Sequence, residues 1–341
     1  MGIDRQRIVK NFYPPGSEVA SHFTPCSIPF ACTGDEWYEY DQDAARNTIE
    51  RLFPDGLDTQ IHLRDVVRGY LPLPKEVAAD LQAQLADIGI NATIDIQEST
   101  TYIDNADQGK LPGIHLLGWG ADYPDMTNFL DYHFGPGASA QFGDKFDEIT
   151  DPLGVGSSSV EDADREAAYT EANNAVRELV PMIPIAHGGS GAAFQANIEG
   201  AHSSPLGNES MAVMGPGDDD QFVWLQNGEP GGLYCADESD GEALRVCEQI
   251  TEALYAYEVA GTAAEPSLAE ECVPNDELSE WTCTLRQGVS FHDGSTLDAN
   301  DVVLSYAVQW DADHPLHVGR DGSFTYFAAL WGGFLNPPPA E

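Results

Sequence analysis

Alternating apolar and polar residues predict a layered arrangement of strands and helices between residues 58 and 120. Residues 59–64 and 90–96 each alternate, as strands with one buried face do. Residues 114–117 follow a Pro-Gly turn and predict a third strand. Between the first two strands, apolar residues recur every three or four positions, as on one face of a helix. The residues of this face are Val77, Leu81, Leu85 and Ile88. Gly89 is a C-cap candidate, and the strand–helix–strand order favours an α/β layer with parallel pairing.

A long helix is predicted over residues 159–179. Ser159 followed by Asp162 is a capping signal, and Pro181 ends the pattern. The predicted buried face consists of Ala168, Ala172, Val176 and Leu179. Residues 182–186 then predict an edge strand or a short first-turn strand, because their prolines exclude a central position in a sheet.

A turn-rich, acidic segment near residues 215–221 predicts a boundary between two parts of the chain. Beyond it the pattern predicts a strand over 222–225, a helix face from Leu244 to Leu254, a strand over 281–285 and a helix capped by Asp298. The predicted organisation is a first domain over residues 1–215, a second segment over residues 221–336 and a tail over residues 337–341.

The charge balance excludes several classes of partner. The chain has 57 Asp and Glu residues against 15 Lys and Arg residues, a net charge of −42. Such a surface repels phosphate backbones and anionic headgroups, so we expect no nucleic-acid partner and no docking on lipid. Hydrophobic residues make up 42% of the chain, enough for a core, and no apolar stretch is long enough to span a bilayer. The scarcity of lysine favours either adaptation to high salt or an ordinary acidic extracellular protein.

The six cysteines lie in three closely spaced pairs. Six thiols allow 15 pairings, but short separations favour pairing within each pair. The pairs are Cys26 with Cys32, Cys235 with Cys247 and Cys272 with Cys283. No CxxC occurs and no His stands at zinc-finger spacing, so we favour disulfides, and hence an oxidising compartment, over metal binding or six buried free thiols. The first residues carry charge but no apolar run, so we expect no signal peptide in this sequence.

One segment comes close to a catalytic motif. Residues 188–192, GGSGA, nearly match the G-x-S-x-G of a nucleophile elbow, in which Ser190 would act with His187. An elbow needs a helix directly after the serine, whereas residues 192–198 predict extended backbone. A serine hydrolase is therefore an alternative, not the main prediction. Weak candidates for metal ligands are His292, Asp293, His314 and His317. We expect neither a metal nor a cofactor.

Four segments resemble the extracytoplasmic solute-binding proteins of oligopeptide and dipeptide ABC importers, solute-binding protein family 5. Residues 285–305, LRQGVSFHDGSTLDANDVVLS, resemble that family's LR-x-G-V-x-F-H-D-G signature and the helix after it. Residues 266–270, PSLAE, resemble the segment that precedes the signature. Residues 3–9, IDRQRIV, and residues 118–125, GWGADYPD, resemble the opening of the family's third structural region and its cleft segment.

The resemblance implies a periplasmic-binding-protein-like fold of type II, in which α/β lobes carry mixed sheets flanked by helices. Residues 1–215 would be the C-terminal-lobe-like, ligand-gripping domain with its return strand. Residues 221–336 would be the start of the N-terminal lobe, which precedes the other lobe in the family but follows it here. The match is therefore expected to be partial and permuted, with an incomplete fold.

The resemblance also implies which residues hold a ligand. The family binds peptide as an extended strand and holds its α-ammonium with a carboxylate. That carboxylate would be Asp122, with Trp119 lining a pocket wall and Tyr123 beside them. Glu229 matches a cleft-edge position more loosely. An Arg that assists some relatives is replaced here by Leu116.

The expected function is binding of oligopeptides or similar solutes outside the cytoplasm, periplasmic or at the cell surface, without catalysis. The expected partners are a small solute and the membrane subunits of an ABC permease, and the chain is expected to be monomeric. Besides the hydrolase that would use Ser190 and His187, a secreted interaction protein that lacks a ligand cleft is the other alternative.

Overall fold

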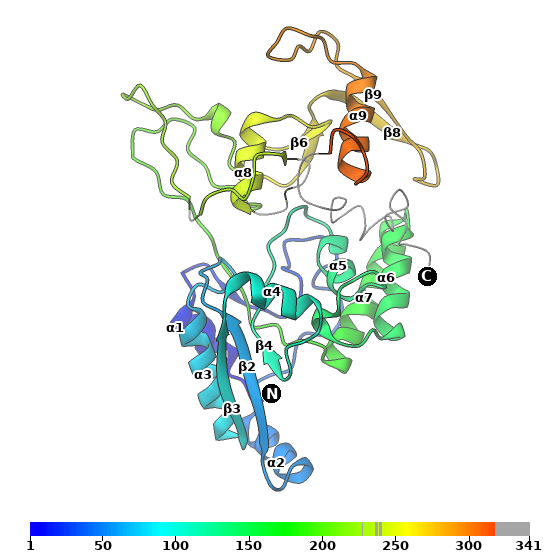
Figure 1. Cartoon of the computed structure of the whole chain (residues 1–341). Coiled ribbons are helices and arrows are strands. Elements are labelled where there is room, and N and C mark those ends of the chain that lie inside the picture. The colour runs from blue at the N-terminus through cyan, green and yellow to red at the C-terminus, as the bar shows by residue number, and fades with distance from the viewer. Residues whose placement is uncertain (227, 236–237, 239–240, 318–341) are drawn as a thin grey trace. The chain divides into compact units, whose positions relative to one another are not determined.

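The computed structural model describes residues 1–226, 228–235, 238 and 241–317. The chain divides into two compact units, Met1–Ser190 and a second that begins at Gly191 (Figure 1). The predicted boundary near residues 215–221 lies further along the chain, and the assignment of the two predicted parts to family lobes remains a prediction. The tail over residues 337–341 and the end of the 221–336 segment lie outside the described residues.

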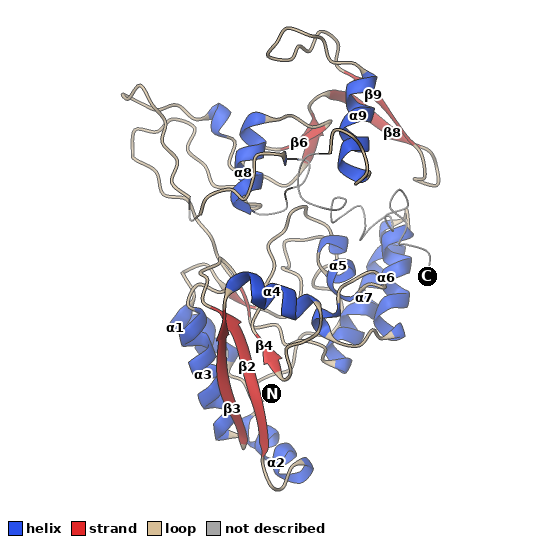
Figure 2. Cartoon of the chain, in the orientation of Figure 1, coloured by secondary structure: helices blue, strands red, loops and turns tan. Residues whose placement is uncertain are grey.

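A three-stranded parallel sheet with the order β3-β2-β4 supports the first unit. Strands β2 (Leu57–Arg64) and β3 (Ile90–Gln97) pair along their whole length, and β4 (Ile114–His115) pairs with the other edge of β2. Helix α3 (Pro74–Asp87) connects the first two strands, as Figure 2 shows. Gly89 follows this helix with a φ of 89°, a conformation that glycine adopts without strain. The predicted parallel α/β layer is confirmed.

The predicted helix face packs against the sheet. Val77, Leu81, Leu85 and Ile88 are all buried, and they contact Ile61 and Leu63 of β2 in one hydrophobic cluster. His62 lies between those two strand residues and is also buried, so it points to the opposite face. Its ring nitrogens face Asp95 Oδ2 and the Pro112 carbonyl oxygen, each at 2.8 Å. The imidazole thus ties β2 to β3 and to the turn before β4.

Helix α1 (Arg5–Phe12) begins within the Ile3-Asp4-Arg5 motif, and both polar residues of the motif have structural roles there. Asp4 is the N-cap and accepts a hydrogen bond from the Arg7 backbone N–H at 2.9 Å. The Arg5 guanidinium donates to the carbonyl oxygens of three separate segments, at Ala20, Tyr38 and Pro184. One side chain therefore satisfies three backbone acceptors that the fold brings together.

A second core of the first unit is helical. Helices α6 (Asp147–Ser158) and α7 (Asp162–Leu179) lie side by side. The long helix predicted over residues 159–179 is confirmed as α7, which ends at the predicted Leu179. Its predicted start was wrong, because Ser159 ends α6 by donating its backbone N–H to the Val155 carbonyl oxygen. Of the predicted face, Ala168, Ala172 and Val176 are buried, and Leu179 is partly buried.

The first unit is completed by shorter elements. They are α2 (Gln42–Leu52), α4 (Ser99–Asp107), α5 (Leu130–Phe134), the 3₁₀ turns η1 (Met126–Asn128) and η2 (Ala140–Phe142), and the strands β1 (Glu18–Val19) and β5 (Ala186–His187). The two short strands pair antiparallel. Only the last residue of the predicted 182–186 strand is extended in a ladder, and Pro184 has no N–H to donate to one.

Among its described residues, the second unit consists of short strand pairs, two α-helices and one 3₁₀ turn. Its elements are η3 (Met211–Val213), α8 (Gly241–Ile250), β6 (Tyr255–Tyr257), β7 (Ala264–Pro266), β8 (Ala269–Pro274), β9 (Trp281–Leu285) and α9 (Ala299–Trp310). Strands β6 and β7 form one antiparallel pair, and β8 and β9 form another. Asp298 is the N-cap of α9, as predicted, and it forms a complete capping box with Asp301.

Two predictions for the second unit were wrong. Residues 222–225 form no strand, and Leu225 is 88% exposed, so their apolar run is not buried in a sheet. Helix α8 ends at Ile250 and does not reach Leu254. Within the described ranges, no helix is both long and apolar enough to cross a membrane.

Three disulfides join the cysteines as the spacing predicts: Cys26–Cys32, Cys235–Cys247 and Cys272–Cys283. The last pair joins residues directly opposite each other on β8 and β9. The disulfide at Cys247 fastens helix α8 to the loop before it. Each closed loop is short, so the bonds act mainly within local elements.

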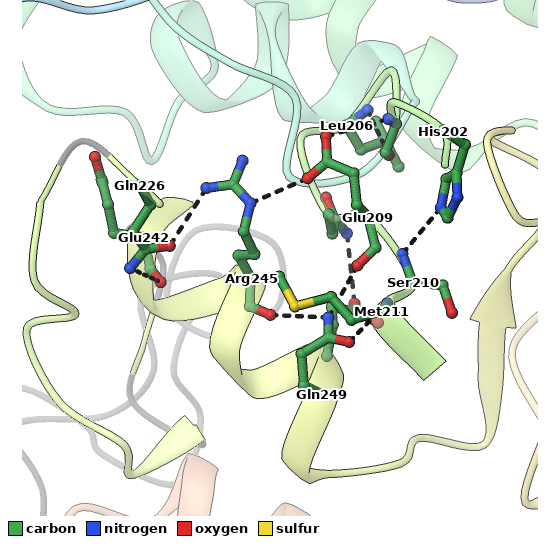
Figure 3. Close-up of polar contacts among 12 residues, drawn as sticks. His202, Leu206, Glu209, Ser210, Met211, Gln226, Glu242, Arg245 and Gln249 are labelled. Carbon is green, nitrogen blue, oxygen red and sulfur yellow. Dashed lines mark hydrogen bonds and ion pairs between the residues drawn. The ribbon is translucent and has the colours of Figure 1, made fainter. Parts of the chain in front are cut away.

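A polar network fixes residues 202–211 against α8, which explains why the first unit ends before the predicted boundary (Figure 3). Buried Glu209 accepts a hydrogen bond from Arg245 Nε at 3.1 Å. Gln249 donates to the Glu209 carbonyl oxygen at 3.0 Å and accepts from the Met211 N–H at 2.9 Å. A buried carboxylate is stable only when paired in this way.

Replacing Arg245 with methionine should loosen this contact strongly. The variant keeps the apolar stem but leaves the Glu209 carboxylate without its cation, which costs about 3–5 kcal/mol when the charge stays buried. Hydrogen exchange of the α8 amides should therefore accelerate. The matched control is Arg46→Met, which removes a pair whose partner Asp43 is 87% exposed, with an expected cost under about 1 kcal/mol. Unchanged α8 protection in Arg245→Met would show that the pair is not structural.

Candidate site at the end of strand β4

The Gly118–Asp125 segment leaves the sheet at the carboxyl end of β4. The Leu116 N–H donates to the His62 carbonyl oxygen at 2.9 Å. This hydrogen bond keeps the backbone extended along β2 up to the start of the segment. A side chain at Gly118 would collide with the Tyr70 ring, so this close approach requires glycine. In open α/β sheets the carboxyl ends of the strands are where ligands bind. The fold therefore presents the predicted cleft segment at a suitable edge.

A single amide oxygen organises the segment. Asn128 is completely buried, and its Oδ1 accepts from the Asp122 backbone N–H at 2.9 Å and from Trp119 Nε1 at 3.2 Å. The structure thus brings together two of the predicted site residues. Asn128 follows Asp125, the N-cap of η1, whose Oδ1 accepts from the Thr127 N–H at 3.0 Å.

Aromatic rings form one wall beside Asp122. Trp119 stacks on Tyr132 with ring centroids 4.6 Å apart, and the His133 ring meets Trp119 edge-on at 5.0 Å. Burial raises the pKa of Tyr132, and the carboxylates of Asp107 and Asp122 raise it further. The wall is therefore apolar on its ring faces and lies in a negative field, an environment that favours a cation.

Tyr123 points into the supporting turn. Its hydroxyl oxygen accepts from Thr127 Oγ1 at 3.2 Å, and burial raises its pKa to about 12. Asp125 forms an ion pair with Arg165 of α7 at 2.8 Å. These contacts bind the segment to the helical core, and the ligand-binding role of Tyr123 remains a prediction.

Asp131 is a partly buried carboxyl group of α5, next to Tyr132 in the chain. Its Oδ2 accepts a hydrogen bond from the Tyr169 hydroxyl at 3.4 Å. Burial raises its pKa to about 7, and the neighbouring Asp125 carboxylate adds to the shift. Sequence reasoning missed Asn128, Asp131 and Tyr132, because each acts through contacts that only the folded turn creates.

The remaining predicted residue, Glu229, belongs to the second unit and is exposed. Its role in ligand binding stays a prediction. The segment that contains it follows Trp224, whose ring lies under the Arg245 guanidinium at 5.6 Å.

The motif around Ser190 does not form a nucleophile elbow. Residues 191–195 are irregular, with no helix after the serine. His187 Nε2 faces the Phe23 carbonyl oxygen at 3.3 Å, so the ring is engaged away from a catalytic pairing. Gly189 donates its N–H to Ser17 Oγ at 2.9 Å, and Gly188 lies so close to the Gly69 carbonyl that only glycine fits. These glycines serve close backbone packing.

The His292-Asp293 segment is a turn. Asp293 Oδ1 accepts from the Ser295 N–H at 2.8 Å, and Gly294 has a φ of 88°. Of the other two weak metal candidates, His317 Nδ1 donates to the Val308 carbonyl oxygen at 2.6 Å, and His314 Nδ1 accepts from the Leu316 N–H. Both histidines thus have structural contacts with backbone.

The chain matches the sequence model of a known protein family. The model of the bacterial extracellular solute-binding proteins, family 5, matches residues 1–141 and 263–323, which is more than half of the chain. The chain belongs to this family. The match is partial, as the motifs predict, and the family-5 signature at residues 285–305 falls within its second stretch.

Curated relatives match about three fifths of this chain. Heme-binding protein A of Haemophilus influenzae is 26% identical over 216 residues, covering 61% of this chain and 39% of the relative. Di/tripeptide-binding protein 1 of Pseudomonas aeruginosa is 27% identical over 220 residues, covering 62% and 40%. The chain spans about two fifths of the length of the curated relatives it matches.

Solved structures confirm the type II periplasmic-binding-protein fold. The dipeptide-binding protein of Pseudoalteromonas in complex with Met-Leu aligns with a TM-score of 0.55 and 25% identity, covering 62% of this chain and 43% of the other. HbpA2 of Haemophilus parasuis aligns with the same TM-score at 21% identity, covering 63% and 43%. The relatives are named as binding proteins and not as enzymes.

The shifted pKa of Asp131 predicts a pH-dependent stability. The folded carboxyl titrates at about 7 and an ordinary one at 3.8, so the folded protein keeps a proton that the unfolded chain releases. This contribution is complete below pH 3.8 and is lost as the pH rises through 7, by about 1.4 kcal/mol per pH unit between them.

Asp131→Asn replaces the carboxylic acid with a neutral group that still accepts from Tyr169. Its melting temperature should therefore fall less than that of the wild type between pH 5 and pH 8. The measurement is calorimetric melting at both pH values. Equal falls for the two proteins would show that Asp131 does not carry the effect.

Proposed function

We propose that this family-5 chain binds oligopeptides or similar small solutes outside the cytoplasm and delivers them to an ABC-type permease. One observation carries the proposal. The buried Asn128 amide fixes both the Asp122 backbone and the Trp119 indole, so a carboxylate is held beside an aromatic wall. A peptide α-ammonium needs both features, a fixed anion and a surface that excludes water.

Asp122 would hold the ligand ammonium through a charge-assisted hydrogen bond. Such a bond contributes about 1.5–3 kcal/mol when shielded from water. The Asp107 carboxylate strengthens the negative field at Tyr132 and so adds to the attraction for the ligand ammonium. The backbone of an extended peptide would pair with the segment beyond β4, as in strand addition, while Trp119 and Tyr132 contact its side chain.

The three disulfides support a location outside the cytoplasm, because such bonds persist in oxidising compartments. The relatives named periplasmic, such as the peptide transport protein SapA of Salmonella typhimurium, agree with this. We further propose that the chain acts as a monomer and presents its ligand to membrane permease subunits. Catalysis is not part of the proposal, since the segment around Ser190 lacks the elbow geometry.

A dipeptide and its blocked form test the ammonium anchor. Met-Leu should bind the wild-type chain in calorimetric titration, and N-acetyl-Met-Leu, which has no ammonium, should bind far more weakly. Asp122→Asn removes the anion and should weaken Met-Leu binding by about tenfold or more, since 1.4 kcal/mol corresponds to tenfold.

Asp43→Asn is the matched control, because Asp43 is an exposed residue on α2, and it should leave the affinity unchanged. Equal binding of free and acetylated dipeptide would contradict the anchor at Asp122. Binding of haem without any binding of Met-Leu would contradict the peptide assignment itself and point to the ligand named for the Haemophilus relative.

A further inference from the structure

A histidine lies against the Cys26–Cys32 disulfide, between β1 and α2. One ring nitrogen of His22 and the two cysteine sulfurs all lie within 4.8 Å of one another. Ser21 Oγ completes the cluster, at 3.7 Å from Cys26 Sγ and 3.8 Å from Cys32 Sγ. Nothing in the proposed peptide site uses this group.

The His22 ring is buried and incompletely hydrogen-bonded. The residue is only 5% exposed, and its Nδ1 lies 3.0 Å from Ser21 Oγ. Its Nε2 is buried without a well-formed hydrogen bond among the described residues, although the ring also interacts with the Gly34 backbone. Buried polar nitrogens are nearly always well paired, so a ring nitrogen with poor hydrogen-bond geometry calls for an explanation.

We propose that His22, Cys26 and Cys32 bind a zinc ion when the disulfide is reduced. A dithiol reductant supplies two electrons and two protons, so the sulfur–sulfur bond breaks, two thiols form and the reductant becomes a disulfide. Zinc binding then releases the two thiol protons to solvent as two zinc–sulfur bonds form. The oxidised protein has no thiolates to offer and does not bind the ion there.

The geometry suits this ion. Zinc–sulfur bonds of about 2.3 Å and zinc–nitrogen bonds of about 2.0–2.1 Å place tetrahedral ligands roughly 3.5–3.8 Å apart. The three ligand atoms already lie within 4.8 Å, so only small shifts are needed once the sulfurs separate. Three protein ligands leave a fourth position for water or a solute group.

Access differs along the cluster. Cys26 is exposed, so a reductant can reach the disulfide, whereas His22 is buried and held in place by its surroundings. Among the described residues, neither of the other two disulfides forms such a group with a histidine. The cluster therefore distinguishes this disulfide from the two that fasten α8 and the β8–β9 pair.

Cobalt titration tests the site, because cobalt replaces zinc and gives a visible thiolate charge-transfer band. The full chain is reduced with a phosphine, which offers no thiol of its own, and the reductant is removed without air. The reduced wild type should show the band and bind a single zinc ion in competition. The oxidised wild type should show neither.

The Cys26→Ser, Cys32→Ser double variant keeps the other four thiols and should lose the site after reduction. His22→Ala should bind at least about tenfold more weakly, since even residues that only support a ligand contribute that much. Should His22→Ala fail to fold, the single variant Cys26→Ser, at an exposed position, decides the question. A reduced wild type without the band, or a reduced double variant that binds cobalt as tightly as the wild type, would overturn the proposal.

Discussion

The candidate site depends on one buried amide oxygen. Asn128 Oδ1 accepts from the Asp122 backbone and from the Trp119 indole, and no water competes because the residue is completely buried. The segment that it holds is irregular backbone beyond β4. This segment has no strand hydrogen bonds of its own to fix its conformation. Without that acceptor, two partly buried donors would lose their partner, at up to about 1–3 kcal/mol each. The sheet positions the segment, and the amide fixes its conformation.

Much of the first unit could be predicted from local pattern. Strand alternation and helix spacing identified β2, β3 and α3, because their buried faces repeat regularly along the chain. Pattern failed where a helix end depends on its neighbours. Ser159 has the residue type of an N-cap, yet it closes α6. Residues 222–225 are apolar enough for a strand but have no partner strand in the described structure.

The site could be predicted only through its motif. Asp122 and Trp119 were predicted because the GWGADY segment resembles the family, whereas the local sequence alone, Asp122 before Tyr123 and a proline, is typical of a turn. Asn128 and Tyr132 were missed because a lone Asn and a lone Tyr carry no periodic signal. His22 was missed for a similar reason, although its place four residues before Cys26 was a signal that could have been tested.

The most direct test is the affinity of Asn128→Ala for Met-Leu, measured by calorimetric titration beside the wild type. The control is Asn91→Ala, which removes an exposed hydrogen bond from β3 to Asp58 of β2. We expect the wild type and the control to bind alike and Asn128→Ala to bind about tenfold more weakly or not at all while still melting cooperatively. A folded Asn128→Ala variant with wild-type affinity would contradict the account.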